Sequence, residues 1–223
     1  MVKIKICGMR RPEDMEMANK YKPDYIGFVF AESPRKVSYD QARELSGLLS
    51  EDIVPVGVFV NEHMKLIVDL FKEGIIEMAQ LHGDEDENYI KNLKAKSLEE
   101  TGSEIPVVNA IEITSEDRDY NKRLFEWSDS AADYFILDSG KGSGKTFNWD
   151  LIDKDNEFFK HSIFLDLNEK PNFFSRENFE SGNSIFIKKL KNTSFIFFHG
   201  KNIRTTDIQE ILGQGKIYAA ILS

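Results

Sequence analysis

Three polar side chains at the ends of apolar stretches could carry acid–base chemistry. The one cysteine, Cys7, follows the residues KIKI, Asp138 follows DYFIL, and His82 follows IEMAQL. A thiol and a carboxylic acid differ in intrinsic acidity, and such a pair suits a reaction that moves a proton between two sites. The alternatives are structural: a free cysteine is usually a small buried hydrophobe, Asp138 could cap a turn, and His82 could be a satisfied polar group.

Two further segments favour an anionic small molecule. Arg35, in ESPRKVS, carries a planar fork of donors that matches the two oxygens of a carboxylate. The segment GKGSGKTFNW offers backbone N–H groups to a phosphate, with Gly142, Ser143 and Gly144 at its centre. It is not a nucleotide-binding P-loop, because G-x-x-x-x-G-K-T would need glycine where Ser139 stands.

The composition excludes several classes of protein. The 223 residues carry a net charge of −9 without a basic stripe, which argues against nucleic-acid binding. No apolar run has the length of a membrane span, and MVKIKICGM lacks the apolar core of a signal peptide. A single cysteine forms no internal disulfide, so a cytoplasmic location is expected. The four histidines show no metal-ligand spacing, so no metal is predicted.

Short apolar stretches alternate with helical ones over the first two thirds of the chain. Strands are predicted over 2–7, 24–30, 54–60, 76–82, 105–111 and 133–138, and helices lie between them. Ser38 and Gln41 form a capping-box pattern, and Asn61 is expected to cap a helix that ends near Gly74. This alternation implies a parallel sheet with helices outside it. At this length the two main options are a doubly wound sheet and a (β/α)8 barrel, and the absence of G-x-G-x-x-G after the first strand argues against a dinucleotide-binding fold.

Strand parity predicts which side chains face the interior of such a barrel. Ile6 lies on one face of the first strand, and Lys5 and Cys7 lie on the other. The outward faces meet apolar helices, so Lys5 points inward and its charge could favour a Cys7 thiolate. The strand ends then meet at the C-terminal rim, where barrel enzymes place their chemistry. The side chains predicted to face inward are Lys5 and Cys7 of the first strand and Tyr134, Ile136 and Asp138 of the sixth. Gln80 and His82 share one face of the fourth strand.

Taken together, these stretches resemble the phosphoribosylanthranilate isomerase family of tryptophan biosynthesis. The matching stretches run from residue 1 to about residue 152: KICGMRRPED, DYIGFVFAESPRKVS, VGVFVNE, QLHGDE, FILDS and GSGKTFNW. The resemblance implies a single (β/α)8 barrel over residues 1–223. It also implies an Amadori rearrangement of an aminoaldose phosphate to an aminoketose phosphate, without a cofactor.

The resemblance assigns roles to individual residues. Cys7 is expected to be the general base, Asp138 the general acid, and Arg35 the contact to the anthranilate carboxylate. Further substrate contacts are expected from Gln80, His82, Gly142, Ser143 and Gly144. A phosphorylated small molecule is the expected partner of a monomer or homodimer that binds neither nucleic acid nor membranes.

The last third, residues 150–223, departs from the family pattern. After a seventh strand expected over 162–165, the family's GGLNPEN loop is replaced by DLNEKPN, without the glycine pair whose N–H groups bind phosphate. Asn109 replaces the family's usual lysine. The eighth strand is expected in SFIFFHGKN, but a second alignment makes this segment strand seven and KIYAAILS strand eight. Two other hypotheses therefore stay open: a degenerate barrel without activity, and an isomerase of another sugar phosphate.

Overall fold

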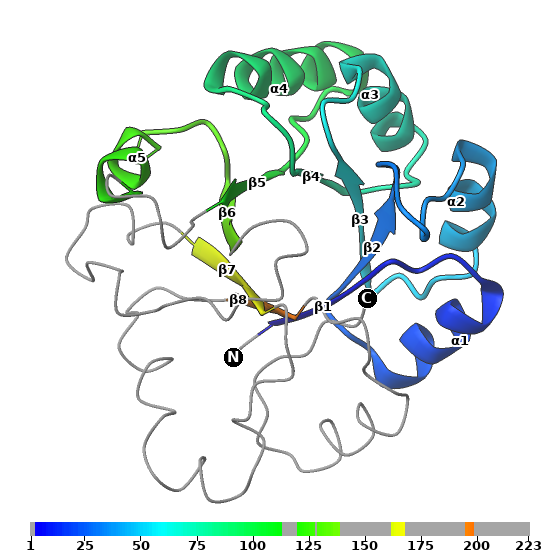
Figure 1. Cartoon of the computed structure of the whole chain (residues 1–223). Helices are drawn as coiled ribbons and strands as arrows, with labels where there is room; N and C mark the ends of the chain where they lie inside the picture. The colour runs from blue at the N-terminus through cyan, green and yellow to red at the C-terminus, as the bar shows by residue number, and fades with distance from the viewer. Residues whose placement is uncertain (1–2, 113–119, 128, 139–161, 168–194, 199–223) are drawn as a thin grey trace, which may run out of the picture.

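Parallel strands alternate with helices in the part of the chain that the computed structural model describes, residues 3–112, 120–127, 129–138, 162–167 and 195–198 (Figure 1). The strands are β1 (Lys3–Cys7), β2 (Tyr25–Val29), β3 (Val54–Phe59), β4 (Met78–Leu81), β5 (Val107–Glu112), β6 (Tyr134–Asp138), β7 (Ser162–Leu167) and β8 (Phe195–Phe198). The helices are α1 (Pro12–Tyr21), α2 (Tyr39–Ser46), α3 (Met64–Lys72), α4 (Glu87–Thr101) and α5 (Tyr120–Glu126). The protein is therefore of the α/β class.

The strands form one parallel sheet whose order follows the chain. Each strand pairs with the next, and β8 also pairs with β1, so the sheet closes on itself. Figure 1 shows the labelled helices outside the ring of strands. This order differs from that of a doubly wound sheet, in which the direction of winding reverses.

The two alignments of the last third are distinguished by the seventh and eighth strands. The residues Phe195–Phe198 form β8, and Phe195 pairs with Lys3 of β1. The segment Ser162–Leu167 forms β7, beside β6. The alignment that makes FIFFHGKN the seventh strand is therefore wrong. The other residues of 150–223 lie outside the described part.

Apolar side chains on the outer faces of the strands pack against the helices. Phe135 of β6 is fully buried, and its ring meets that of Trp127, just after α5, edge to face with the centroids 6.2 Å apart. Burying one side chain of this size contributes roughly 1.5–3 kcal/mol. Because neighbouring strand residues point to opposite faces, the outward position of Phe135 places Tyr134 and Ile136 toward the interior. This agrees with the predicted parity of β6.

The predicted capping box at the start of α2 is present. The N–H of Gln41 donates to Ser38 Oγ at 3.2 Å, and the N–H of Ser38 donates to Gln41 Oε1 at 3.0 Å. Two orphan donors of the first turn are thus satisfied reciprocally.

The predicted cap of α3 is wrong. The helix begins at Met64 with His63 at the N-cap position. Asn61 instead has a φ of +51°, and its side chain turns to the loop after β4. Its Oδ1 accepts from the N–H of Asp84 at 2.8 Å, and its Nδ2 donates to Asp84 Oδ2 at 3.1 Å. Hydrogen bonds from the Asn61 side chain to the loop after β4 therefore take the place of a cap on α3.

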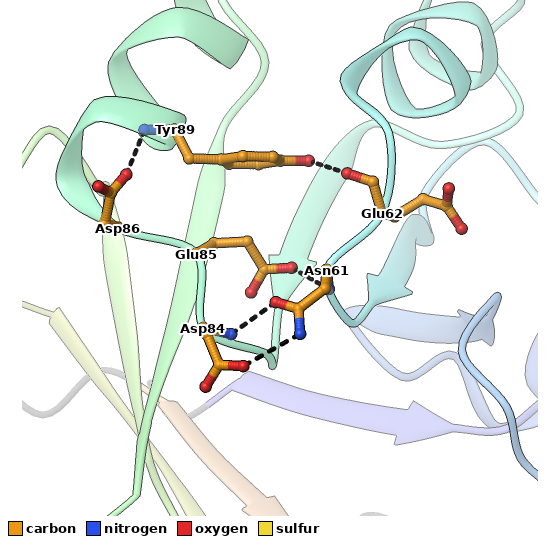
Figure 2. A pocket seen from close by; sticks show the side chains of 6 residues that line it. All are labelled: Asn61, Glu62, Asp84, Glu85, Asp86 and Tyr89. Atoms are coloured by element: carbon orange, nitrogen blue, oxygen red, sulfur yellow. Dashed lines mark hydrogen bonds between the residues drawn. The ribbon is translucent and has the colours of Figure 1, made fainter.

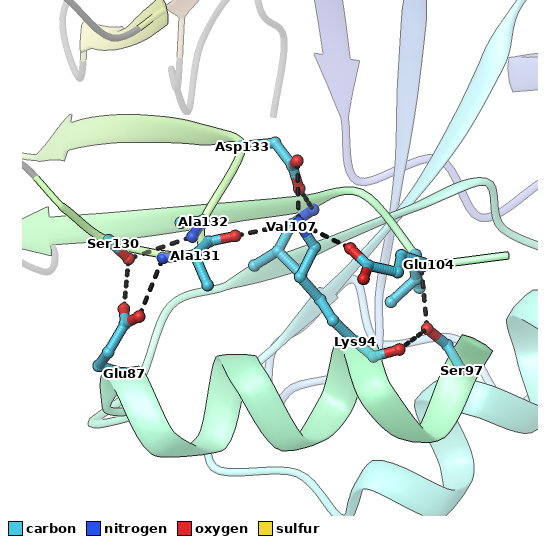
Figure 3. A network of polar contacts seen from close by, with 10 residues as sticks. Glu87, Lys94, Ser97, Glu104, Val107, Ser130, Ala131, Ala132 and Asp133 are labelled. Atoms are coloured by element: carbon cyan, nitrogen blue, oxygen red, sulfur yellow. Dashed lines mark hydrogen bonds and ion pairs between the residues drawn. The ribbon is translucent and has the colours of Figure 1, made fainter. Parts of the chain in front are cut away.

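A polar network fastens α4 to the start of β5 and the residues before β6 (Figure 3). Lys94 Nζ donates to Asp133 Oδ1 at 2.9 Å, and the other oxygen of Asp133 accepts from the N–H of Val107 at 2.7 Å. Glu87 accepts from the N–H of Ala131 at 2.9 Å. The network fixes β5 and β6 in register at the end of the sheet away from Cys7.

Candidate active site

Cys7 and Lys5 share the inner face of β1, with Lys5 one layer below. Both are buried, with 3% and 2% of their surface exposed. A Cβ on Gly27, which pairs with Cys7, would lie 2.6 Å from Cys7 Sγ and 3.1 Å from Lys5 Cε. The two side chains therefore converge on the space that any larger residue at 27 would occupy. This matches the orientation predicted from strand parity.

Arg35 reaches back from the loop after β2 to the end of β1. Gly8 has a φ of +89°, and a Cβ there would lie 2.5 Å from Arg35 Cδ and 3.2 Å from its Nη1. Position 8 therefore favours glycine for two reasons: its backbone is left-handed, and the Arg35 side chain passes where a Cβ would lie. The structure brings Arg35 and Cys7 together, as a site for an anion beside a thiol requires.

The guanidinium of Arg35 is half-buried and carries unused donors. Burial lowers its pKa, Cys7 opposes this effect, and Arg10 adds to it. Within the described residues this guanidinium makes no hydrogen bond or ion pair. A cation in such a setting is well placed to receive a carboxylate or phosphate oxygen.

A second arginine, Arg10, stands in the loop between β1 and α1. Its Nη1 donates to the carbonyl of Pro34 at 2.8 Å, which joins this loop to the one that carries Arg35. The buried carboxylate of Asp14 accepts from the N–H groups of Arg10 and Arg11, both at 3.0 Å. Positive charge therefore gathers at the end of β1 on a well-braced loop.

Gln80 and His82 extend the site across the interior. Gln80, in β4, is buried and accepts a hydrogen bond from Lys5 Nζ. Its Nε2 lies 3.2 Å from Nδ1 of His82, the residue that follows β4. A continuous polar chain therefore runs from β1 to the rim above β4.

The sixth strand supplies the remaining candidate at this rim. Asp138 is the last residue of β6, and its Cα pairs with that of Glu112 at the end of β5. Cys7 likewise ends β1, so both lie at the C-terminal edge of the closed sheet. Gly142, Ser143 and Gly144 lie outside the described residues.

The loops after β3 and β4 form a second, acidic pocket at the rim (Figure 2). It is lined by Asn61, Glu62, Asp84, Glu85, Asp86 and Tyr89. The carboxylate of Glu85 is buried and accepts from the N–H groups of Asn61 at 2.6 Å and Gly83 at 2.8 Å. Its oxygens are therefore engaged by the two loops.

Tyr89 closes the other side of this pocket. Its hydroxyl donates to the carbonyl of Glu62 at 2.7 Å, as Figure 2 shows. Burial, followed by the charges of Glu85 and Glu62, raises the pKa of Tyr89 above its usual value. The pocket is thus built from groups that satisfy one another, and its charge disfavours an anion.

Two contributors to the site were not singled out from the sequence. Gly27 is an isolated glycine inside a strand, a pattern that often marks a close approach, and this signal was available. Arg10 stands three residues after Cys7, but nothing in its sequence context distinguishes it from a solvated arginine. The bond between Lys5 and Gln80 joins residues 75 positions apart and has no local signal.

The described part of the chain shows neither a metal-ligand cluster nor a membrane-spanning helix. Those residues contain no group of three or more His, Cys, Asp or Glu side chains that could hold a metal ion. None of the described helices combines the length and the apolarity that crossing a membrane requires.

A parallel sheet surrounded by helices, with polar side chains gathered where its strands end, defines an α/β enzyme of the barrel type. Comparison with protein families matches residues 4–165 to the family described as "N-(5'phosphoribosyl)anthranilate (PRA) isomerase". The chain belongs to this family, as its sequence motifs predict.

Individual relatives agree with this assignment. The N-(5'-phosphoribosyl)anthranilate isomerase of Thermoanaerobacter sp. (strain X514) is 40% identical over 152 residues, which cover 68% of this chain and 70% of that protein. That of Endomicrobium trichonymphae is 41% identical over 170 residues, 74% of this chain and 76% of its own length. A crystal structure of phosphoribosyl anthranilate isomerase in complex with reduced 1-(o-carboxyphenylamino)-1-deoxyribulose 5-phosphate has a TM-score of 0.58 and 22% identity. The match covers 100% of this chain and 88% of the chain in that structure, and it supports the fold.

Proposed function

We propose that this chain catalyses the Amadori rearrangement of N-(5'-phosphoribosyl)anthranilate to 1-(o-carboxyphenylamino)-1-deoxyribulose 5-phosphate in tryptophan biosynthesis. Membership of the family supports this reaction. The observation that carries it is the Arg35 guanidinium, half-buried against Gly8 beside the Cys7 thiol and unpaired within the described residues. A cation placed next to a potential base suits an anionic substrate whose carbon is to be deprotonated.

Asp138 is the general acid of the first step. It gives its proton to the ring oxygen of the ribose, the bond between this oxygen and C1 breaks, and the nitrogen lone pair forms a protonated imine. The position of Asp138 at the end of β6 supports this role, because it shares the C-terminal edge with Cys7.

Cys7 is the general base of the second step. Its thiolate removes the proton on C2, and the electron pair of the C–H bond moves into the protonated imine to give an enolamine. The enolamine then tautomerises to the ketone. The imine serves as the electron sink, and the Arg35 cation interacts favourably with the thiolate.

The other predicted residues hold the substrate. Arg35 binds the anthranilate carboxylate, Gln80 and His82 contact the substrate from β4, and Gly142, Ser143 and Gly144 offer N–H groups to the phosphate. The whole chain, residues 1–223, forms one (β/α)8 barrel whose last third departs from the family pattern. It works in the cytoplasm as a monomer or homodimer.

The loss of anthranilate-type fluorescence on turnover tests the proposal. The unaltered chain should convert the substrate, and Cys7→Ala and Asp138→Ala should each reduce kcat by roughly 10²–10⁴-fold, the usual contribution of one acid–base group. Lys65→Ala, which removes an exposed charge on α3, should leave kcat unchanged. Absence of turnover by the unaltered chain, or full activity in both site variants, would overturn the proposal.

A further inference from the structure

The loop after β1 has its main chain anchored on both sides. The N–H of Met9 donates to the carbonyl of Gly27, in β2, at 3.0 Å. The N–H groups of Arg10 and Arg11 both donate to Oδ2 of Asp14, in α1, at 3.0 Å. The side chain of Asp14 is buried, so water competes little for these bonds. The loop therefore offers the side chain of Arg10 from a fixed main chain.

The loop after β2 contains a tight turn that carries Arg35. The N–H of Lys36 donates to the carbonyl of Ser33 at 3.0 Å, which closes a β-turn with Pro34 and Arg35 at its centre. The N–H of Arg35 also donates to Ser33 Oγ at 3.2 Å. Arg35 is thus the third residue of the turn, and the direction of its side chain depends on the type of turn.

Two types of turn suit this sequence, and they differ in the direction of one peptide plane. Proline at the second position fits both type I and type II, but type II needs a positive φ at the third position. Among the described residues other than glycine, φ is positive at Lys22 and Asn61, and Arg35 is not one of them. The turn is therefore not type II, and this fixes which way the carbonyl of Pro34 points.

Arg10 binds the carbonyl whose direction distinguishes the two types. Its Nη1 donates to the oxygen of Pro34 at 2.8 Å. A peptide plane that turned over would carry this oxygen away and break the bond. Burial lowers the pKa of Arg35 and the charge of Arg10 adds to this effect, so the two cations repel each other. The hydrogen bond holds Arg10 at the turn against this repulsion.

We propose that Arg10 is a positioning residue: by binding the Pro34 carbonyl, it holds the guanidinium of Arg35 at the end of β1. Arg10 acts through the turn and does not touch the ligand. The passage of Arg35 over Gly8 is close, since a Cβ there would lie 2.5 Å from Arg35 Cδ. This deepens the proposed function, on which it rests, because a side chain that is already ordered loses less freedom when a carboxylate binds.

Nitrogen relaxation of the main chain, measured by NMR without substrate, is the direct test. The order parameter of the Arg35 amide should be that of rigid backbone, about 0.85, and in Arg10→Met it should fall toward the flexible range below about 0.6. Arg11→Gln is the matched control, because it removes a charge from the same loop and keeps the bond to Pro34. Arg35 should stay rigid in this control. An equally rigid Arg35 amide in Arg10→Met would overturn the proposal.

Steady-state kinetics tests the effect on the substrate. Arg10→Met should raise KM by roughly 2- to 10-fold, the worth of about one hydrogen bond, and leave kcat nearly unchanged. Arg10→Lys retains a donor for the carbonyl and should recover part of this loss, and Arg11→Gln should match the unaltered chain. A fall in kcat at an unchanged KM would contradict the assigned role.

A double-mutant cycle shows whether Arg10 acts through Arg35. In the Arg35→Ala background, Arg10→Met should cause no further rise in KM, because the group that it positions is gone. An equal rise in both backgrounds would mean that Arg10 attracts the substrate by its own charge, and the proposal would fall. If the unaltered chain shows no turnover, the proposed function fails, and the relaxation measurement still decides whether Arg10 holds the turn.

Discussion

The two sides of the C-terminal rim of the sheet have opposite charge and use their polar groups differently. Beside β1 and β2, Arg35 lies next to Cys7 with its guanidinium donors unpaired within the described residues. Beside β3 and β4, Glu85 accepts two backbone N–H groups, and the hydroxyl of Tyr89 is bonded to a loop carbonyl. One side has donors that are unpaired within the described residues, and the other uses its groups to hold loops together.

We expect this difference to separate substrate binding from structural support on a single rim. A negatively charged substrate is attracted to the cationic side and repelled by the carboxylates of the acidic side, so its orientation is set by charge before close contacts form. Substitutions on the cationic side should therefore change catalysis. Substitutions on the acidic side should change stability.

Among the substitutions that compare the two sides, the largest effect is expected from Gly27→Ala. The new Cβ would lie 2.6 Å from Cys7 Sγ, so the thiol must move, and a displacement of about 1 Å can cost roughly 10²-fold in rate. Gly57→Ala is the matched control, because its Cβ would lie 2.6 Å from the ring of Phe59. That variant should lose stability but keep kcat. Equal losses of kcat in both would mean that Gly27 matters only for packing.

A somewhat smaller effect is expected from Arg35→Ala. Loss of a charge-assisted contact costs about 1.5–3 kcal/mol, which corresponds to roughly a 10- to 100-fold fall in kcat/KM. Steady-state kinetics should show most of this change in KM. Arg43→Ala, on the exposed face of α2, should leave KM unaltered. An unchanged KM in Arg35→Ala would remove the cationic side from substrate binding.

On the acidic side, Glu85→Gln should lower stability and spare activity. The amide retains one acceptor oxygen where the carboxylate offers two, so one buried N–H loses its partner at a cost of about 1–3 kcal/mol. Urea unfolding measures this change in the free energy of unfolding. Glu62→Gln keeps the main-chain carbonyl of residue 62, which accepts from the Tyr89 hydroxyl, and should change stability little. A fall in kcat without a loss of stability would contradict the division between the two sides.

The smallest effect is a loss of stability at alkaline pH through Tyr89. Because the pKa of this phenol is raised in the folded state, its stabilising contribution is complete below the ordinary value of 10.0 and is lost as the pH rises toward the higher folded value. The free energy of unfolding should therefore decline above about pH 10. In Tyr89→Phe this decline should be shallower, and an equally steep decline would exclude Tyr89 as its source.

Strand parity and local capping were predictable because they depend on neighbouring residues. The alternation in KIKIC was sufficient to place Lys5 and Cys7 on one face, and the Ser38–Gln41 pattern predicted a capping box that is present. The segment FIFF was correctly assigned to the eighth strand.

The partners across the sheet were not predictable in the same way. Parity states that Lys5 points inward, but the choice of Gln80 as its partner depends on how the strands are staggered around the closed sheet. Asn61 shows the related limit: its sequence context suits a helix cap, yet a loop from the next strand offers it better partners. Contacts made by the folded chain here override local preference.

The pairing of β1 with β8 has a consequence for the order in which the chain is made. Lys3 is synthesised well before its partner Phe195, which follows it far along the chain. Until then the growing sheet has two edges with unpaired N–H and C=O groups, which are prone to join other chains. The yield of folded protein should therefore depend on how well these exposed edges are kept from aggregating before β8 is made.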